Sequence, residues 1–381
     1  MPASSAWIIS RATDLRWFIG SALASYAILG LALVLPARDP ADFSAFTPVV
    51  LVFLVWGILF DGSHVFATYT RTYFDREAFR GGRALLLGSL GWIALGPAAA
   101  LLDAALGHDG RADPQNGLVY TLFLVFAFSW AYYHLIKQHY GFLMLYKRKN
   151  ADLLPVDNTL DKRFLWVGFG YPYLRFLFGS NIFASGLMGR HTQAEFEGLL
   201  GLQLTSVAFV LDVAFAVATI VYLGRLAQRW WGGQPVDLPK YLLLAAAIPM
   251  HVLVLRYVSD LLLVVAALTI MHNLQYHRLV WFHNQNAYQS GRPDAVARHG
   301  AAVALSRSVL VYLLAGIAFA IPYRMARTFS GDLFGSLLAE QIIGGAVWGV
   351  AFHHYYVDAK IWKLRANARV REDLKLETAG A

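Results

Sequence analysis

The sequence predicts an all-α, polytopic transmembrane helical bundle of about ten spans, forming a single integral-membrane domain over residues 1–381. Three observations lead to this prediction: the composition, a series of long apolar runs, and a one-sided distribution of basic residues. Of the 381 residues, 57% are hydrophobic and 15% are charged. A soluble globular domain has about 45–50% apolar and about 25% charged residues. The composition therefore excludes a disordered chain, a collagen-like fibre and an ordinary soluble globule.

Each predicted span is an apolar run of about 20 residues, which as an α-helix crosses about 30 Å of hydrocarbon. The helical state is expected because a helix satisfies its own backbone hydrogen bonds inside a membrane, and no alternating strand pattern competes. The segment 163–188 contains Arg175 and Pro172, so it is either a span or a re-entrant segment. The ten runs are roughly 17–36, 46–66, 84–105, 117–140, 163–188, 204–224, 240–255, 260–281, 301–321 and 335–357.

The basic residues predict the orientation of these spans. Of the 32 Lys and Arg residues, 24 fall on the side of the N-terminus and 6 on the opposite side. Because cytoplasmic loops carry an excess of Lys and Arg, both termini are expected in the cytoplasm, with the protein in a bacterial inner (plasma) membrane. The formal charge of +8 then reflects topology and contact with membrane lipids. No separate basic domain remains, so nucleic acid is not an expected partner.

Histidines gather at one end of the predicted bundle. Eight of the twelve lie at the C-terminal ends of the second, fourth, eighth and tenth spans, and all four spans run toward the cytoplasm. Ionisable residues in spans are costly and are therefore functional candidates, and neutral imidazole is a common metal ligand. Four such helix ends at one depth predict a histidine-rich metal site that faces the cytoplasm. Its predicted ligands are His64, His134, His139, His272, His277, His283, His353 and His354.

Two carboxylates share helix faces with these histidines. Asp61 lies three residues before His64, and Asp358 lies four residues after His354, so each is predicted to bind the metal or to orient a ligand. The chain has no cysteine, so any metal must be held by His, Asp or Glu. Eight imidazoles exceed what one ion takes, which favours two iron ions over one four-histidine site.

The spacing of His134 and His139 leaves two arrangements open. Five residues turn an α-helix about 140° past a full turn, so these imidazoles cannot bind one ion from a straight helix. Either each faces a different metal, or the helix end is unwound or contains a π-bulge. His283 lies past the membrane edge, where solvation is the alternative to metal binding. His251 could mark a substrate cavity, but a helix–helix hydrogen bond is favoured. The tyrosines near the site, Tyr132 and Tyr276 among them, are expected to form an interfacial belt, with one or two of them free to hydrogen-bond a ligand or bound oxygen.

The pattern His134-x4-His139 and the pair His353-His354 resemble the histidine boxes of the integral-membrane fatty-acid desaturase and hydroxylase superfamily. That resemblance implies a cytoplasm-facing di-iron centre that acts on lipid chains with dioxygen. The segment 270–281 and the element His354-x3-Asp358 are similar to bacterial β-carotene dioxygenases of the bacteriorhodopsin-related-protein family. This second resemblance implies oxygen-dependent cleavage of an isoprenoid. The chain contains no His-x-x-His-His motif.

These observations predict a metal-dependent membrane oxidoreductase: an iron oxygenase, hydroxylase or desaturase that takes a lipid or other apolar substrate from the bilayer and uses O2 as co-substrate. The sequence has no phosphate-binding loop and no nucleotide-binding motif, so any electrons would come from a ferredoxin-like or reductase partner. The alternative is a transporter or channel whose histidines pass protons or metal ions. That function would place ionisable groups along the membrane depth rather than at one face.

Overall fold

The computed structural model describes residues 6–36, 47–108, 117–185, 187–188, 192–288, 294–328, 335–364 and 367–376. All regular structure in these residues is helical, which confirms the predicted all-α class. Residues 46 and 186, which belong to two of the predicted spans, lie outside this set. The chain divides into two compact units, Met1–Pro40 with Tyr132–His272 and Thr378–Ala381, and Ala41–Ala131 with Asn273–Glu377. Each unit is described by itself, and the single domain stays a prediction.

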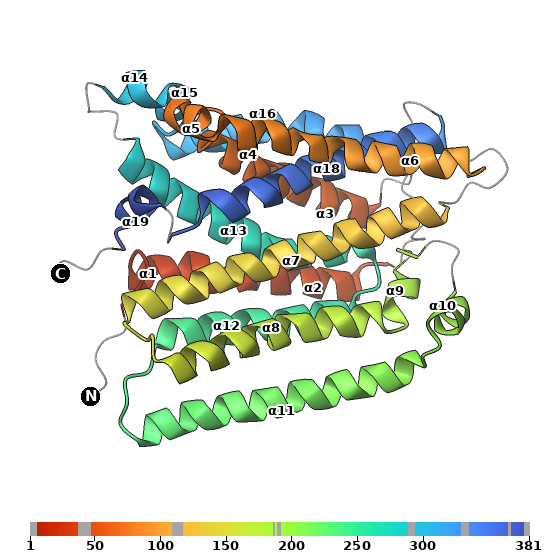
Figure 1. Cartoon of the computed structure of the whole chain (residues 1–381), viewed down its shortest axis with the longest axis horizontal. Coiled ribbons are helices and arrows are strands. Elements are labelled where there is room, and N and C mark those ends of the chain that lie inside the picture. The colour runs from red at the N-terminus through yellow and green to blue at the C-terminus, as the bar shows by residue number, and fades with distance from the viewer. Residues whose placement is uncertain are drawn as a thin grey trace. The chain divides into compact units, whose positions relative to one another are not determined.

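In the first unit, α8 packs against both α11 and α12, and α12 also packs against α2 (Figure 1). Helices α7 and α13 are shared, since the boundary between the units falls within each of them. The elements of the first unit are α1 (Arg11–Asp14), the π-helix η1 (Leu15–Ile19), α2 (Ala22–Val34), the C-terminal part of α7 (Leu118–Lys149), α8 (Pro155–Leu177), α9 (Asn181–Ala184), α10 (Gln193–Leu200), α11 (Leu204–Trp231), α12 (Leu238–Tyr257) and the N-terminal part of α13 (Leu261–Ala287).

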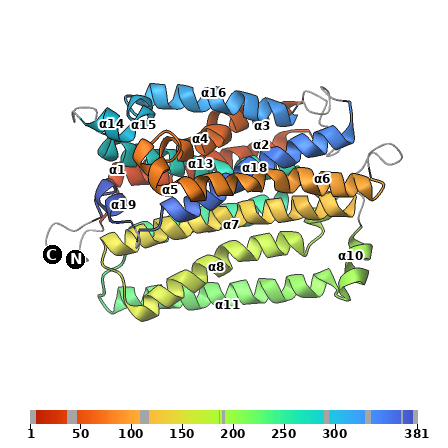
Figure 2. The same ribbon diagram turned by 45° about the horizontal axis from the view of Figure 1, so that its top comes forward.

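In the second unit, α18 lies along η3 and α6, while α16 lies along η2 and α4 (Figure 2). Besides the remaining parts of α7 and α13, its elements are α3 (Pro48–Trp56), the π-helix η2 (Gly57–Gly62), α4 (Ser63–Thr70), α5 (Arg76–Gly88), the 3-10 helix η3 (Ser89–Ala94), α6 (Leu95–Ala105), α14 (Ala295–His299), α15 (Ala301–Leu305), α16 (Val309–Thr328), α18 (Leu337–Ile361) and α19 (Ala368–Asp373).

Seven helical segments of the described chain are long and apolar enough to cross a membrane. The other three predicted spans fall on α8, α13 and α18, which have 23, 27 and 25 residues but are more polar. The apolar helices support a membrane protein, and the count of ten spans stays a prediction. The seven segments are Arg11–Val34, Pro48–Thr70, Arg76–Ala105, Leu118–Lys149, Leu204–Trp231, Leu238–Tyr257 and Val309–Ala326.

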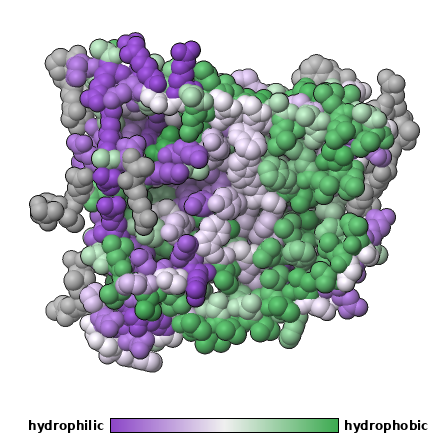
Figure 3. Space-filling model, viewed as in Figure 1, coloured by the Kyte–Doolittle hydropathy of each residue, from purple (hydrophilic) through white to green (hydrophobic). Residues whose placement is uncertain are grey.

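Helix α11 presents an apolar surface that suits lipid. Phe209 is 68% exposed and Ile220 is 71% exposed, although α11 is one of the most apolar segments of the chain. Figure 3 shows hydrophobic side chains over the middle of this helix, at the lower edge of the view. Contiguous exposed apolar surface is unfavourable in water and is typical of a contact with membrane or protein.

A buried network of charges ties together the ends of α7, α8, α11 and α12 in the first unit. Lys147 and Lys240 are fully buried, and each pairs with both Asp152 and Asp161. Arg229 adds a bond of 2.7 Å from its Nη1 to Asp152 Oδ1. Burial alone would raise the pKa of Asp152, but the hydrogen bonds and charges of Lys240, Arg229 and Lys147 outweigh it and hold that pKa at about 2. The carboxylate is therefore ionised at neutral pH, and the buried charges are balanced locally.

Two glycines bring α18 into backbone contact with its neighbours. A Cβ on Gly345 would lie 2.6 Å from the carbonyl carbon of Gly96 in α6. A Cβ on Gly349, one turn later, would lie 2.4 Å from the Cα of Ile93 in η3. Small residues four apart allow helices in membranes to approach this closely. The contact fixes α18 along its length, just before the residues that form the site described below.

We expect Gly345→Ala to destabilise the second unit, because its methyl group would overlap the backbone of α6. Overpacking of this kind costs about 1–3 kcal/mol. Gly344→Ala is the matched control: the nearest atom to its Cβ is the Tyr120 hydroxyl oxygen at 3.4 Å, and alanine favours the helix. The measurement is the thermal unfolding midpoint in detergent. Equal midpoints for the two variants would contradict the close contact between α6 and α18.

Candidate metal centre

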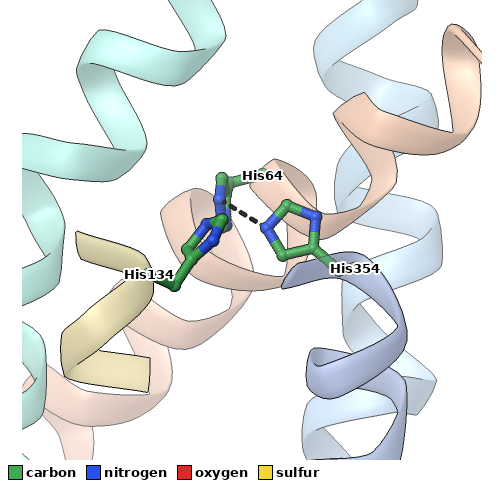
Figure 4. A group of neighbouring side chains, drawn as sticks. All are labelled: His64, His134 and His354. Carbon is green, nitrogen blue, oxygen red and sulfur yellow. Dashed lines mark hydrogen bonds between the residues drawn. The ribbon is translucent and has the colours of Figure 1, made fainter. Parts of the chain in front are cut away.

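The structure brings two of the predicted ligands face to face in the second unit. His64 lies at the start of α4, and His354 lies near the end of α18. Their Nε2 atoms are 3.0 Å apart, and the two rings are nearly perpendicular, at 85° (Figure 4). Both side chains are buried, so water does not compete for these nitrogens.

Thr68 fixes the tautomer of His354. The Nδ1 of His354 lies 2.8 Å from the Thr68 hydroxyl oxygen, and that hydroxyl donates to Asp358 Oδ1 over 2.8 Å. The Thr68 hydroxyl also lies 2.7 Å from the Tyr276 hydroxyl, and when its single proton goes to the carboxylate or to Tyr276 it accepts a hydrogen bond from His354 Nδ1–H. A neutral imidazole carries only one N–H, so the Nε2 of His354 holds a lone pair.

His64 is held in the same tautomer by a different partner. Its Nδ1 lies 3.3 Å from the backbone carbonyl oxygen of Asp61, and a carbonyl only accepts hydrogen bonds. The Nε2 of His64 therefore also carries a lone pair, directed at that of His354. Two lone pairs at 3.0 Å repel unless a proton or a metal ion lies between them. Two nitrogens that each lie about 2.1 Å from one ion, at an angle of about 90°, are about 3.0 Å apart. The pair thus fits two positions of one transition-metal ion.

A hydrogen-bonded group of side chains supports this pair. Asp358 Oδ1 accepts a second bond, 2.7 Å long, from the hydroxyl of Tyr276 on α13. The other carboxylate oxygen lies 3.9 Å from His354 Nε2. Asp358 is therefore linked to His354 through Thr68, and its two predicted roles, as a ligand or as a residue that orients one, stay predictions. Such partners of a ligand fix its ring and raise its basicity.

Thr68 is a residue of this group that the sequence did not single out, and Tyr276 lies in the interior and not at the membrane interface. Thr68 follows His64 by four residues, so helical spacing put both on one face of α4, and that signal was available. Tyr276 was expected in an interfacial belt but is only 2% exposed. Its hydroxyl meets the buried carboxylate of Asp358 instead. Nothing in the linear sequence distinguishes this tyrosine from those at the membrane surface.

The π-helix η2 leads directly into α4 and places Asp61 away from the pair. The Asp61 carboxylate forms an ion pair with Arg324 of α16. Only the backbone carbonyl oxygen of Asp61 contacts His64. Gly62 is needed here because its Cβ would lie 2.6 Å from the side chain of Ala320. π-helical turns are rare in proteins as a whole, and those that occur are often found at functional sites. This one brings α16 against the base of α4.

Three other predicted ligands in the second unit have both ring nitrogens engaged. His277 and His353 each contact two hydroxyl groups. The Nε2 of His283 lies 3.3 Å from Arg71 Nη2 and 3.2 Å from Asp373 Oδ2, and its Nδ1 contacts the side-chain amide of Asn284. In this arrangement their nitrogens are satisfied without a metal. The hydroxyl partners, at 2.9–3.2 Å, are Ser63 and Tyr312 for His277, and Ser89 and Tyr73 for His353.

The remaining predicted ligands lie in the first unit. Helix α7 is an unbroken α-helix from Leu118 to Lys149, so its end is neither unwound nor bulged. His134 and His139 consequently face different neighbours. The ring of His134 lies 5.0 Å from that of His272 on α13, and the ring of His139 lies 5.7 Å from that of His251 on α12. His251 also makes the helix–helix hydrogen bond predicted for it, with Tyr132 of α7 at 3.0 Å.

We expect Thr68→Val to lower stability, since it removes the hydroxyl shared by His354 and Asp358 while keeping the side-chain shape. Leaving buried polar partners unsatisfied costs about 1–3 kcal/mol. Thr68→Ser retains the hydroxyl and is the control. Unfolding midpoints of the two variants in detergent provide the test. If Thr68→Val unfolds at the same midpoint as the wild type, the hydroxyl does not hold this group together.

A scan of protein-family models, a search of curated proteins and a search of solved structures found no match to this chain. The resemblances that the histidine motifs suggested therefore stay predictions.

Proposed function

We propose that this protein is an integral-membrane, non-haem iron enzyme: an O2-dependent oxygenase, hydroxylase or desaturase acting on a lipid or other apolar substrate. The observation that supports this proposal is the pair of buried Nε2 atoms of His64 and His354, which lie 3.0 Å apart. In the proposal His134 supplies a further imidazole, and the metal site faces the cytoplasm. Both points come from the sequence.

The donor set suits a first-row transition metal. Imidazole nitrogen binds iron, copper and zinc well, whereas magnesium and calcium prefer oxygen ligands. With no cysteine in the chain, the site is not a thiolate site. Two or three protein ligands leave coordination positions open, as a site that handles dioxygen requires. The apolar helices around it give a lipid-like substrate a route from the bilayer.

The electron requirement separates the reactions that such a site supports. Hydroxylation places one oxygen atom in the substrate and reduces the other to water with two electrons from a donor. Desaturation reduces O2 to two water molecules, with two electrons from the substrate and two from the donor. Cleavage by a dioxygenase places both oxygen atoms in the products and needs no donor. A ferredoxin-like or reductase partner belongs to the first two reactions only.

A transporter or channel for protons or metal ions is the second candidate, and the facing pair also suits it. One extra proton shared between His64 and His354 would relieve the same repulsion. That arrangement puts a positive charge in a buried site, where Asp358 is the nearby carboxylate. Metal content distinguishes a proton path from the enzyme, because a shared proton leaves the purified protein without iron, and lipid-dependent O2 uptake distinguishes a metal-ion path from the enzyme.

Purified wild-type protein is expected to contain iron, at up to two ions per chain, and to show no Soret band. His354→Asn should lower the iron content by about one ion per chain, because asparagine keeps a donor at the Nδ1 position toward Thr68 but removes Nε2. His64→Asn should do the same. Elemental analysis with an optical spectrum of the same sample is the measurement. His299→Asn, a change outside the predicted ligands, is the control; full iron content in His354→Asn would remove this residue from the site.

Iron-loaded protein in detergent is expected to consume O2 when a membrane lipid extract is added. The test records O2 uptake with and without a reductant, and identifies the products by mass spectrometry. Uptake that needs the reductant indicates hydroxylation or desaturation, and uptake without it indicates cleavage. His354→Asn should abolish the lipid-dependent uptake. If loaded wild-type protein consumes no O2 with any lipid fraction, the oxygenase proposal is wrong.

A further inference from the structure

We propose that His139 and His251 form a second metal site, in the first unit, that shares no ligand with the His64–His354 pair. The site would take a first-row transition-metal ion of the kind that imidazole prefers, such as Fe2+ or Zn2+. This inference rests on the proposed function in one respect: it gives the location of the second ion that the number of histidines predicts.

His139 presents a buried nitrogen lone pair. Its side chain is fully buried on α7, and its Nδ1 lies 2.9 Å from the backbone carbonyl oxygen of Leu135 in the preceding turn. A carbonyl only accepts, so Nδ1 carries the proton and Nε2 carries the lone pair. No hydrogen-bond partner of this Nε2 is found among the described residues.

His251 presents the same group from α12. Its Nδ1 lies 3.0 Å from the Tyr132 hydroxyl, and that hydroxyl donates over 2.9 Å to the carbonyl oxygen of Phe169. The hydroxyl therefore accepts from His251 Nδ1–H, which leaves the Nε2 of His251 with the lone pair. Within the described chain this nitrogen is also buried without a hydrogen-bond partner. A buried polar atom left unpaired is costly, and two of them in adjacent rings call for a common explanation.

The distance between the two ring centroids leaves room for one ion bound by both histidines. Their ring centroids are 5.7 Å apart and the rings are perpendicular, at 90°. An imidazole bound through Nε2 at about 2.1 Å has its centroid about 3.2 Å from the ion, so two ligands at about 110–125° have centroids about 5.2–5.7 Å apart. The observed distance lies at the upper end of that range.

An aromatic side chain closes the site on one side. The Phe169 ring lies 4.7 Å from the ring of His139 and 4.9 Å from that of His251. The carbonyl of the same residue orients His251 through Tyr132. Helix α8 thus contributes both an apolar wall and a hydrogen-bond acceptor, which are the features that orient histidine ligands at metal sites.

The test measures binding of Fe2+ and of Zn2+ to metal-stripped, full-length protein in detergent. His251→Asn keeps an N–H toward Tyr132 but removes Nε2, and His139→Asn likewise keeps the bond to Leu135. Each variant is expected to bind one ion fewer than the wild type. His354→Asn should lose the other ion, and His299→Asn is the control with wild-type binding. A wild-type number of ions in His251→Asn would overturn the proposal.

A second variant covers the case in which His251→Asn does not fold. Tyr132→Phe keeps the ring but removes the hydroxyl that orients His251, and loss of such a partner weakens metal binding about 10–100-fold. Unchanged affinity for both ions would reject the second site. The two proposals fail in different ways. If the wild-type protein binds no metal, both the second site and the proposed function are wrong. If His354→Asn loses an ion but His251→Asn and His139→Asn do not, the second site is wrong and the proposed function stands.

Discussion

A histidine inside an apolar helical bundle has two ring nitrogens and no water for either of them. The way each nitrogen is satisfied separates seven of the twelve histidines into two groups. In His277, His353 and His283 both nitrogens meet polar side chains, so the imidazole helps to hold helices together. In His64, His354, His139 and His251, Nδ1 meets a carbonyl or a hydroxyl oxygen, and Nε2 is the buried nitrogen that the two proposals assign to a metal ion.

The supporting structure keeps these nitrogens where they are. In the second unit, α18 rests on backbone contacts at Gly345 and Gly349, which leave little freedom to slide along α6 and η3. In the first unit the helix ends are joined by buried charges around Lys240 and Asp152. Neither the glycine contacts nor the buried charges involve the histidines themselves, and both act on the helices that carry them. Rigid elements around a ligand set are what keep a site in one geometry.

Much of the architecture was predictable, because apolar run length and composition determine where helices form in a membrane protein. The all-α class is confirmed, and seven helices have the character of spans. The unbroken α7 removes the unwound or bulged helix end as the arrangement for His134 and His139, and the arrangement in which each faces a different metal stays a prediction. Spacing along one helix indicates which residues share a face.

Partners across helices were not predictable in the same way. The carbonyl that holds His64, the hydroxyl of Tyr132 and the ion pair of Asp61 with Arg324 depend on how closely helices pack and at what register. Small residues such as Gly345 set that register, and their sequence signal is weak. Tyr132 and Tyr276 are buried and so do not belong to the interfacial belt, and the sequence did not indicate which of the tyrosines would lie inside. A tyrosine is compatible with either place because its ring is apolar and its tip is polar.

The π-helix η2 also bears on how such a protein evolves. One additional residue in a helix turns everything that follows it by about 100° relative to what precedes it. The apolar segment Pro48–Trp56 and the polar segment that begins at Ser63 are separated by η2, so a single inserted codon is enough to re-aim His64 and Thr68 while the preceding apolar surface stays in place. A ligand can therefore be gained or lost in one mutational event, without rebuilding the span that carries it.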